Sequence, residues 1–240
     1  MSDTGINIYR GDYRKVLRHV EAQLIFTSPP YNIGSKSERK DGQRRNGKYD
    51  AKSFGGIRNY PDSLPENEYQ KQQTAFLQWA VSHLKPDGVL VYNHKPRRNG
   101  RMIHPMEWFL QAPELRLMEE VIWDRGSTHN HSNRMLWPQT ERLYVFVKQG
   151  GKYPFINNQH LAHRSDVWRI PRARSNGHNA PFPLELAIQV IKAWSKPGEL
   201  VCDPYTGSGT VAMACKQLGR RFEGAEILPK YFDLARERVA

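Results

Sequence analysis

The sequence predicts an α/β protein with a mostly parallel sheet. Short apolar segments, typical of buried strands, alternate with amphipathic segments of helical period along the 240 residues. A turn with two glycines separates one apolar segment from a helix, and two other apolar segments are joined only by a polar loop. Because parallel strands need a long crossover, this last pair is expected to form an antiparallel hairpin on the sheet. We expect one domain spanning residues 1–240.

The predicted strands are runs of apolar residues that stop at Gly, Pro or polar side chains. In chain order they span residues 6–10, 23–27, 89–94, 115–125, 141–148, 199–203 and 220–226. The turn Pro86-Asp87-Gly88 leads into the third strand. The fourth and fifth strands form the expected hairpin.

The predicted helices are segments in which apolar residues share one helical face. They span residues 13–20, 66–84, 104–111 and 183–194, the segment after the glycine turn at 207–209, and 229–240. Pro183 suits the start of its helix. Four tryptophans occupy apolar positions and are expected in the core: Trp79, Trp108, Trp123 and Trp194.

Charge and cysteine content narrow the class of protein. The formal net charge is +12, which favours a polyanionic partner such as nucleic acid over a generic basic protein. Cys202 and Cys215 lack metal-binding spacing, so a reduced cytoplasmic setting is expected. The N-terminus lacks a signal-peptide pattern, and no apolar run reaches membrane-spanning length. We expect a soluble intracellular protein.

The glycine turn indicates a nucleotide-containing ligand. Gly207, Gly209 and Ala212 follow a G-x-G-x-x-A pattern between a strand and a helix. Glycine allows close approach of the backbone, and helix amides favour electron-rich groups. Glu226 ends the next strand, where an acid can accept hydrogen bonds from ribose hydroxyls. A nicotinamide dinucleotide fits this pattern as well.

The segment Ser28-Pro29-Pro30-Tyr31 ends the strand at 23–27. The two prolines make a rigid turn and leave carbonyl groups without sheet partners. A hydroxyl, a bare carbonyl and an aromatic ring at a strand end could hold a planar ring that bears an amino group. The alternative is an edge strand ended by proline, with a tyrosine that only packs.

Together these motifs resemble those of the S-adenosylmethionine-dependent DNA amino-methyltransferases, which modify adenine N6 or cytosine N4. "TSPPYN" resembles the catalytic motif, and "DPYTGSGT" resembles the cofactor loop, with Tyr205 replacing the usual Phe. "HNAPFP" resembles the segment before that loop, and Gly11-Asp12 the acidic position near the cofactor adenine. The motif order resembles the permuted β group. The resemblance implies a Rossmann-like class I methyltransferase fold with helices on both faces.

The resemblance also implies roles for individual residues. Ser28 Oγ and the Pro29 carbonyl would hold the amine hydrogens, Pro30 would keep the turn rigid, and Tyr31 would stack on a base flipped out of DNA. No metal is implied. The implied S-adenosylmethionine-binding residues are Asp12, His178, Phe182, Asp203, Tyr205, Gly207, Ser208, Gly209, Thr210 and Glu226.

The target base is ambiguous at this level. Ser28 occupies the first position of the catalytic motif, where Ser is more typical of cytosine-N4 members and Asp of adenine members. Asn32, Gly34 and the motif order resemble adenine members, so adenine N6 is slightly favoured. The cytosine-C5 route, which uses a Pro-Cys nucleophile, is disfavoured because neither cysteine follows proline.

Three basic segments are candidate DNA contacts: the loop 35–60, with eight Lys or Arg and three Asp or Glu, "KPRRNGR", and "HRSDVWRIPRAR". The predicted contacts are Arg39, Lys40, Arg44, Arg45, Lys48, Arg97, Arg98, Arg169, Arg172 and Arg174. The usual recognition region would be the connector 150–177, which is short. Recognition could be shared with the loop 35–60, be minimal, or come from a second subunit in a homodimer. A cognate restriction enzyme is a possible partner.

Other functions remain open on the sequence alone. The same chemistry could act on RNA or on a protein side-chain amide, and a non-catalytic basic nucleic-acid-binding module is a further class. A nicotinamide dehydrogenase lacks an evident proton-transfer group. A metal site at His129, His131, His160 and His163 is disfavoured, because no clustered Cys or carboxylate supplies further ligands.

Overall fold

The computed structural model describes residues 5–32, 64–128, 133–134, 136–153, 164–173 and 183–240. Several sequence predictions fall outside these residues. They are the loop 35–60 with Arg39, Lys40, Arg44, Arg45 and Lys48, and also Gly34, His129, His131, His160, His163, Arg174, His178 and Phe182.

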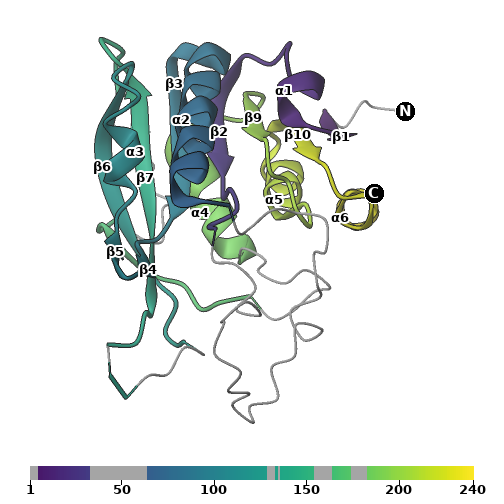
Figure 1. Cartoon of the computed structure of the whole chain (residues 1–240). Helices are drawn as coiled ribbons and strands as arrows, with labels where there is room; N and C mark the ends of the chain where they lie inside the picture. Colours follow the sequence, from purple (N-terminus) through teal and green to yellow (C-terminus); the bar gives the residue numbers. More distant parts are fainter. Residues whose placement is uncertain (1–4, 33–63, 129–132, 135, 154–163, 174–182) are drawn as a thin grey trace.

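The described residues form one eight-stranded sheet (Figure 1). Its strands, in spatial order, are β1 (Ile6–Arg10), β10 (Arg221–Glu226), β9 (Leu200–Asp203), β2 (Ala22–Thr27), β3 (Leu84–His94), β7 (Thr140–Lys148), β6 (Leu115–Asp124) and β8 (Val167–Arg169). β7 runs antiparallel to both of its neighbours, and the other neighbouring pairs are parallel. The predicted mostly parallel sheet with an antiparallel hairpin is therefore confirmed.

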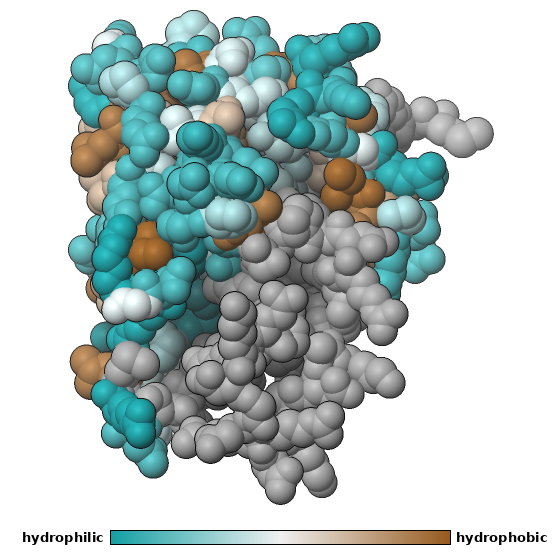
Figure 2. All heavy atoms as spheres, in the orientation of Figure 1, coloured by the Kyte–Doolittle hydropathy of each residue, from teal (hydrophilic) through white to brown (hydrophobic). Residues whose placement is uncertain are grey.

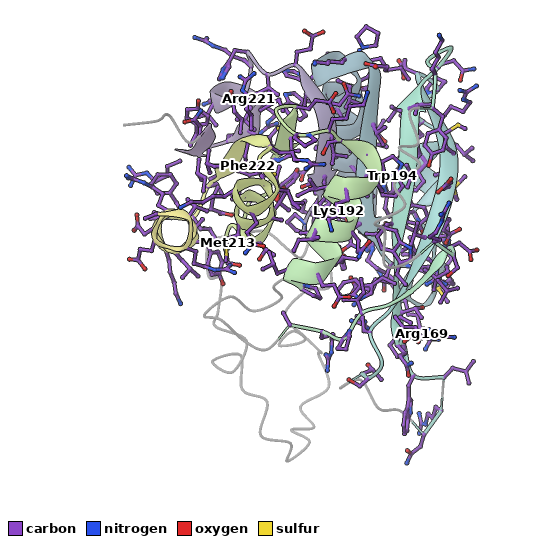
Figure 3. All side chains as sticks on the ribbon, turned by 180° about the vertical axis from the view of Figure 1, so that it is seen from behind. Arg169, Lys192, Trp194, Met213, Arg221 and Phe222 are labelled. Carbon is purple, nitrogen blue, oxygen red and sulfur yellow. The ribbon has the colours of Figure 1, made fainter. Side chains whose placement is uncertain are left out.

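Helices cover both faces of the sheet (Figures 1 and 3). On one face lie α1 (Tyr13–Val16), α2 (Glu66–His83) and α3 (Met106–Phe109). On the other lie α4 (Leu184–Trp194), α5 (Thr210–Leu218) and α6 (Pro229–Val239). Each face has its own apolar core, and all six residues of β2 are buried between the two. A strand buried on both sides is the pattern of the interior of a parallel sheet.

The structure differs from the predicted elements where local sequence is a weak guide. α1 and α3 are four residues long, shorter than predicted. β3 begins at Leu84, so the expected turn at Pro86–Gly88 lies inside the strand as an irregularity: Ala22 pairs with Leu84, but Leu24 pairs with Val89. A Cβ at Gly88 would lie 3.0 Å from the Ala22 carbonyl oxygen, which explains why glycine fits this irregularity.

Three short strands were not predicted. β4 (Arg97–Asn99) and β5 (Arg101–Ile103) form a small separate hairpin, and β8 lies within the basic connector. Three residues are too few to show the alternation that identifies a strand. Trp168 of β8 lies between arginines in the sequence but is buried, with its ring centroid 6.2 Å from that of Trp194.

Two further observations concern the distribution of apolar residues. The face in Figure 2 is mostly hydrophilic, with scattered apolar residues. No helix in the described part of the chain is long and apolar enough to cross a membrane.

Candidate active site

The carboxyl ends of β1, β10, β9 and β2 meet at one edge of the sheet, because these strands are neighbours and parallel. The Gly11 amide after β1 donates to the Glu226 carbonyl oxygen at 3.0 Å. The Thr27 hydroxyl at the end of β2 donates to Asp203 Oδ1 at the end of β9, at 2.7 Å. Thus motifs from the beginning and the end of the chain lie side by side.

The glycine turn is fixed by close packing. Gly207 and Gly209 have φ of 54° and 79°, a region that glycine adopts without strain. Gly209 is the N-cap of α5, and a Cβ there would lie 3.1 Å from the Ala235 Cα of α6. In β10, a Cβ at Gly224 would overlap Thr206 Oγ1. The turn therefore packs closely against both α6 and β10.

Two buried carboxylates lie beside the turn. Glu226 accepts the Gly207 amide at 2.9 Å and the Leu228 amide at 2.8 Å. Burial raises the pKa of Glu226, and it raises the pKa of Asp203 to about 7. Among the described residues neither carboxylate has a Lys, Arg or His partner within salt-bridge distance. A ligand with positive charge and hydroxyl groups would compensate for this burial.

The end of β1 adds an acid and an aromatic cluster. Asp12 caps α1 by accepting the Arg14 amide at 2.9 Å, and its carboxylate also pairs with the Arg14 guanidinium. This hydrogen bonding holds the pKa of Asp12 below its usual value. The Tyr13 and Tyr205 rings are 5.3 Å apart, so Tyr205 belongs to an aromatic cluster at the same edge.

The Ser28–Tyr31 motif leaves the sheet at the end of β2, where it meets Asn93 of the neighbouring β3. Ser28 Oγ lies 3.1 Å from Tyr31 Oη and 3.2 Å from Asn93 Oδ1. Tyr31 Oη lies 2.6 Å from Asn93 Oδ1. Ser28 and Tyr31 are half-buried, whereas Asn93 is buried. The predicted catalytic side chains Ser28 and Tyr31 thus lie within hydrogen-bond distance of Asn93, a polar residue of the neighbouring strand β3.

Behind Tyr31 lies a buried ion pair. Glu141 Oε2 accepts the Tyr31 hydroxyl at 3.0 Å, and Glu141 Oε1 accepts Arg125 Nη1 at 2.9 Å. Lys95 Nζ is 3.5 Å from the same Oε1 and 5.5 Å from the centre of the Tyr31 ring. Burial, and then the charge of Glu141, raise the pKa of Tyr31 well above its usual value, so Tyr31 keeps its proton.

The other side of the motif is held by Tyr69 and His94. Tyr69 Oη lies 2.8 Å from the Pro30 carbonyl oxygen and 2.7 Å from His94 Nε2. His94 Nδ1 faces the Lys95 carbonyl oxygen at 2.8 Å, so that nitrogen carries a hydrogen. Burial lowers the pKa of His94 to about 3. The Tyr31 ring packs on His94 at 4.4 Å between centroids, which limits how far the ring can move.

Asn32 ends the motif in an unusual conformation. Its φ is 54°, in the left-handed region that Asn tolerates better than most residues. Its side-chain Nδ2 donates to the Leu64 carbonyl oxygen at 2.9 Å, and its Oδ1 accepts the Leu64 amide at 2.7 Å. This amide clamp joins the two residues that flank the segment 33–63.

The predicted DNA contacts that lie within the described residues divide into three groups. Arg98 and Arg169 are exposed, and Arg169 lies at the carboxyl end of β8 (Figure 3). Arg172 is half-buried. Arg97 contradicts its predicted role: it is 7% exposed, its guanidinium pairs with both Glu66 oxygens at 2.8 and 2.9 Å, and it lies 4.5 Å above the Tyr69 ring. It is a structural cation and is not available to phosphate.

Sequence reasoning missed Asn93, His94, Tyr69, Glu141 and Arg125 as residues of the site. A signal existed for the first two, since polar residues at the end of an apolar strand are the same pattern that identified Ser28. Glu141 is the second residue of β7, and only the antiparallel direction of β7 brings its first residues to this edge. That direction follows from long-range pairing.

The fold and this edge define a class of protein: an α/β enzyme that binds a nucleotide-containing cofactor beside a rigid acceptor site. Residues 22–237 match the profile of the N6/N4 DNA methylase family, described as DNA methylase. The chain therefore belongs to that family of S-adenosylmethionine-dependent amino-methyltransferases. This membership confirms the predicted family and the predicted cofactor.

Individual relatives agree with this assignment. The type II methyltransferase M.BglII of Bacillus subtilis is 26% identical, over 95% of this chain and 67% of that protein. M.HpaI of Haemophilus parainfluenzae is 25% identical, over 94% of this chain and 71% of that protein. M.Cfr9I of Citrobacter freundii is 41% identical, but over 54% of this chain and 46% of that protein.

Solved structures share the fold. The cytosine-N4-specific PvuII DNA methyltransferase superposes with a TM-score of 0.74 at 20% identity, covering 97% of this chain and 86% of that chain. The M1.HpyAVI–SAM complex gives 0.67 at 19% identity, covering 97% and 98%. A DNA modification methylase from Thermus thermophilus, complexed with S-adenosyl-L-methionine, gives 0.67 at 25% identity, covering 98% and 93%. The predicted class I methyltransferase fold is confirmed.

Proposed function

We propose that this protein is a site-specific DNA methyltransferase that transfers the methyl group of S-adenosylmethionine to the exocyclic amino group of a flipped-out base. One observation carries the proposal. The Thr27–Asp203 hydrogen bond, at 2.7 Å, connects the strand that ends in Ser28-Pro29-Pro30-Tyr31 to the strand that ends in the glycine turn. The residues suited to an amine and those suited to a nucleotide cofactor therefore occupy one edge.

The residues around the glycine turn fit the cofactor. Glu226 has carboxylate oxygens able to accept ribose hydroxyls, and buried Asp203 would gain from the positive charge of the cofactor. Asp12 and Tyr205 would contact the adenine side, and the Gly207–Thr210 backbone would face the methionine part. When bound, the cofactor supplies an electrophilic methyl group on a sulfonium sulfur.

The Ser28–Tyr31 motif would hold the acceptor base. The exocyclic nitrogen is a weak nucleophile because its lone pair is delocalised into the ring. Ser28 Oγ and the Pro29 carbonyl oxygen would accept its hydrogens and favour a geometry in which the lone pair is free to attack. Tyr31 would stack on the base. Positioning of amine and methyl donor supplies the remaining rate enhancement.

A base within a duplex cannot reach this edge, so it must leave the stack. We propose adenine N6 as the favoured acceptor, on the Asn32 and Gly34 pattern, with cytosine N4 as the alternative raised by Ser28. Exposed Arg98 and Arg169 would contact phosphates, together with the basic segments 35–60 and 150–177. The proposal also includes one domain spanning residues 1–240, assembly as a homodimer, and a cognate restriction enzyme as a partner.

A labelling assay tests the function. The protein is incubated with radiolabelled S-adenosylmethionine and methylation-free amplified genomic DNA, and the DNA is digested to nucleosides. We expect the labelled nucleoside to be N6-methyl-2′-deoxyadenosine. Label as N4-methylcytosine would overturn the choice of base, and label in added RNA or protein, with none in DNA, would overturn the DNA proposal.

A substitution tests the role of the aromatic ring. Tyr31→Ala should abolish methyl transfer, because the base loses its stacking surface, while calorimetric binding of S-adenosylmethionine persists. Loss of cofactor binding as well would show that Tyr31 has a structural role instead.

A further inference from the structure

The Ser28 hydroxyl has a polarity problem that the carboxylate typical of adenine members would not have. A carboxylate only accepts hydrogen bonds, but a hydroxyl both donates and accepts. If Ser28 pointed its hydrogen at the substrate amine, it would donate to the nitrogen lone pair that has to attack the methyl group. The orientation of this one hydrogen therefore matters to the proposed reaction.

The surroundings of Ser28 fix that orientation. Asn93 Nδ2 donates to the Arg142 carbonyl oxygen at 2.9 Å, so Oδ1 is the amide atom that faces Ser28 and Tyr31. Glu141 presents Oε2 to Tyr31 while Arg125 binds Oε1. Asn93 Oδ1 and Glu141 Oε2, here called the acceptor pair, have no hydrogen to donate. Both belong to buried residues, at 0% and 8% exposure.

Counting hydrogens gives the same result in each arrangement. Ser28 and Tyr31 bring two hydroxyl hydrogens to the acceptor pair. If Tyr31 donates to Glu141, Asn93 Oδ1 is left for Ser28, at 3.2 Å. If Tyr31 donates to Asn93, at 2.6 Å, Ser28 donates to the Tyr31 oxygen, at 3.1 Å, or shares Asn93. In each arrangement an inward acceptor is available to the Ser28 hydrogen, which leaves the Ser28 lone pairs for the substrate.

We propose that Asn93 and Glu141 are positioning residues that make the Ser28 hydroxyl a pure hydrogen-bond acceptor for the substrate amine. Asn93 acts directly on Ser28, and Glu141 acts through Tyr31. The inference rests on the proposed function, since it assigns the acceptor pair to the same site. It also explains how serine can stand where a carboxylate is common.

A double-mutant cycle tests this proposal. Asn93→Leu and Glu141→Gln are each made in the natural sequence and in the Ser28→Ala variant, and single-turnover methylation is measured at saturating S-adenosylmethionine and methylation-free DNA. Asn93→Leu should slow transfer about thirtyfold, because it leaves Ser28 only the Tyr31 oxygen, at 3.1 Å, of its two inward acceptors. Glu141→Gln should slow transfer about fivefold, because Tyr31 then competes with Ser28 for Asn93 Oδ1. In the Ser28→Ala background each loss should shrink to less than about twofold.

Losses of equal size in both backgrounds would overturn the proposal, since a merely structural role does not depend on the Ser28 hydroxyl. Glu120→Gln is the matched control: Glu120 lies on β6 and pairs with Arg142 at 2.9 Å, and its loss should leave the rate unchanged. Thermal melting and calorimetric cofactor binding verify folding, and if Asn93→Leu does not fold, the Glu141→Gln cycle decides. A natural protein that methylates no DNA would instead overturn the proposed function.

Discussion

At the residue scale, the most informative side chains are buried polar groups that the fold holds at a cost. Asp203 is 2% exposed and accepts the Thr27 hydroxyl and the Tyr205 amide with the same oxygen. Two neutral donors do not compensate for burial of a charge, which is why the pKa rises. Such a group is expected where a cationic ligand binds.

The raised pKa of Asp203 gives a pH dependence with a definite sign. Because the pKa is about 7 in the folded state and about 4 in the unfolded chain, the contribution of Asp203 to stability is fully present below about pH 4 and is lost as the pH rises toward 7. Asp203→Asn, which can keep both hydrogen bonds to its oxygen, should therefore stabilise the cofactor-free protein at pH 8, by about 2–4 kcal/mol.

The measurement is thermal unfolding of both proteins at pH 4 and pH 8, with calorimetric titration of S-adenosylmethionine at pH 8. The stability gain should vanish at pH 4, and cofactor affinity should fall. An equal gain at both pH values would show that ionisation of Asp203 is not its source.

At the element scale, the hairpin of β4 and β5 separates two neighbouring arginines by function. Arg97 is buried against Glu66 of α2 and the Tyr69 ring, whereas Arg98 faces the opposite side of β4 and is exposed. Arg97→Ala should lower the free energy of unfolding by about 1–3 kcal/mol, because it removes a buried guanidinium from the Tyr69 ring and takes the cationic partner from the half-buried Glu66 carboxylate. Arg98→Ala should leave stability unchanged and weaken DNA binding.

Chemical denaturation and DNA binding by fluorescence anisotropy separate these outcomes. Equal stabilities of the two variants would contradict the structural role given to Arg97.

β10 offers a second prediction at this scale. A methyl group at Gly224 would overlap Thr206 Oγ1 and would lie 2.6 Å from the Phe222 ring. Gly224→Ala should displace the glycine turn and weaken cofactor binding by at least about tenfold, as backbone shifts to relieve overpacking cost roughly 1–3 kcal/mol. Calorimetry with S-adenosylmethionine is the readout. Gly198→Ala is the control for a glycine replaced without overlap, because a Cβ there meets nothing within 4 Å; any loss of stability from its φ of 82° should leave cofactor binding unchanged.

At the scale of the whole molecule, the net charge of +12 predicts how DNA binding responds to salt. Binding that releases counterions weakens linearly in log salt concentration. Between 50 and 200 mM salt, affinity for non-specific DNA should fall by at least about tenfold, measured by anisotropy. Affinity that does not change with salt would contradict phosphate contact as the main source of binding.

The sequence was sufficient to predict the mostly parallel sheet and the family, because each motif that indicates them is local: a strand, its terminal residues and a turn. It failed where the outcome depends on distant partners. Arg97 resembles a phosphate contact until Glu66 is placed beside it, and Glu141 resembles an ordinary start of a strand until the direction of β7 is known. β8 is recognised only through its pairing with β6.

The amide clamp between Asn32 and Leu64 has a consequence for how such a protein diversifies. Both hydrogen bonds of the clamp use only residues that flank the segment 33–63. The two ends of that segment are therefore held together next to Tyr31 by contacts that do not depend on the residues between them. A change of sequence within the segment leaves both hydrogen bonds of the clamp possible, so relatives of this chain that keep Asn32 can differ in the segment without losing its attachment.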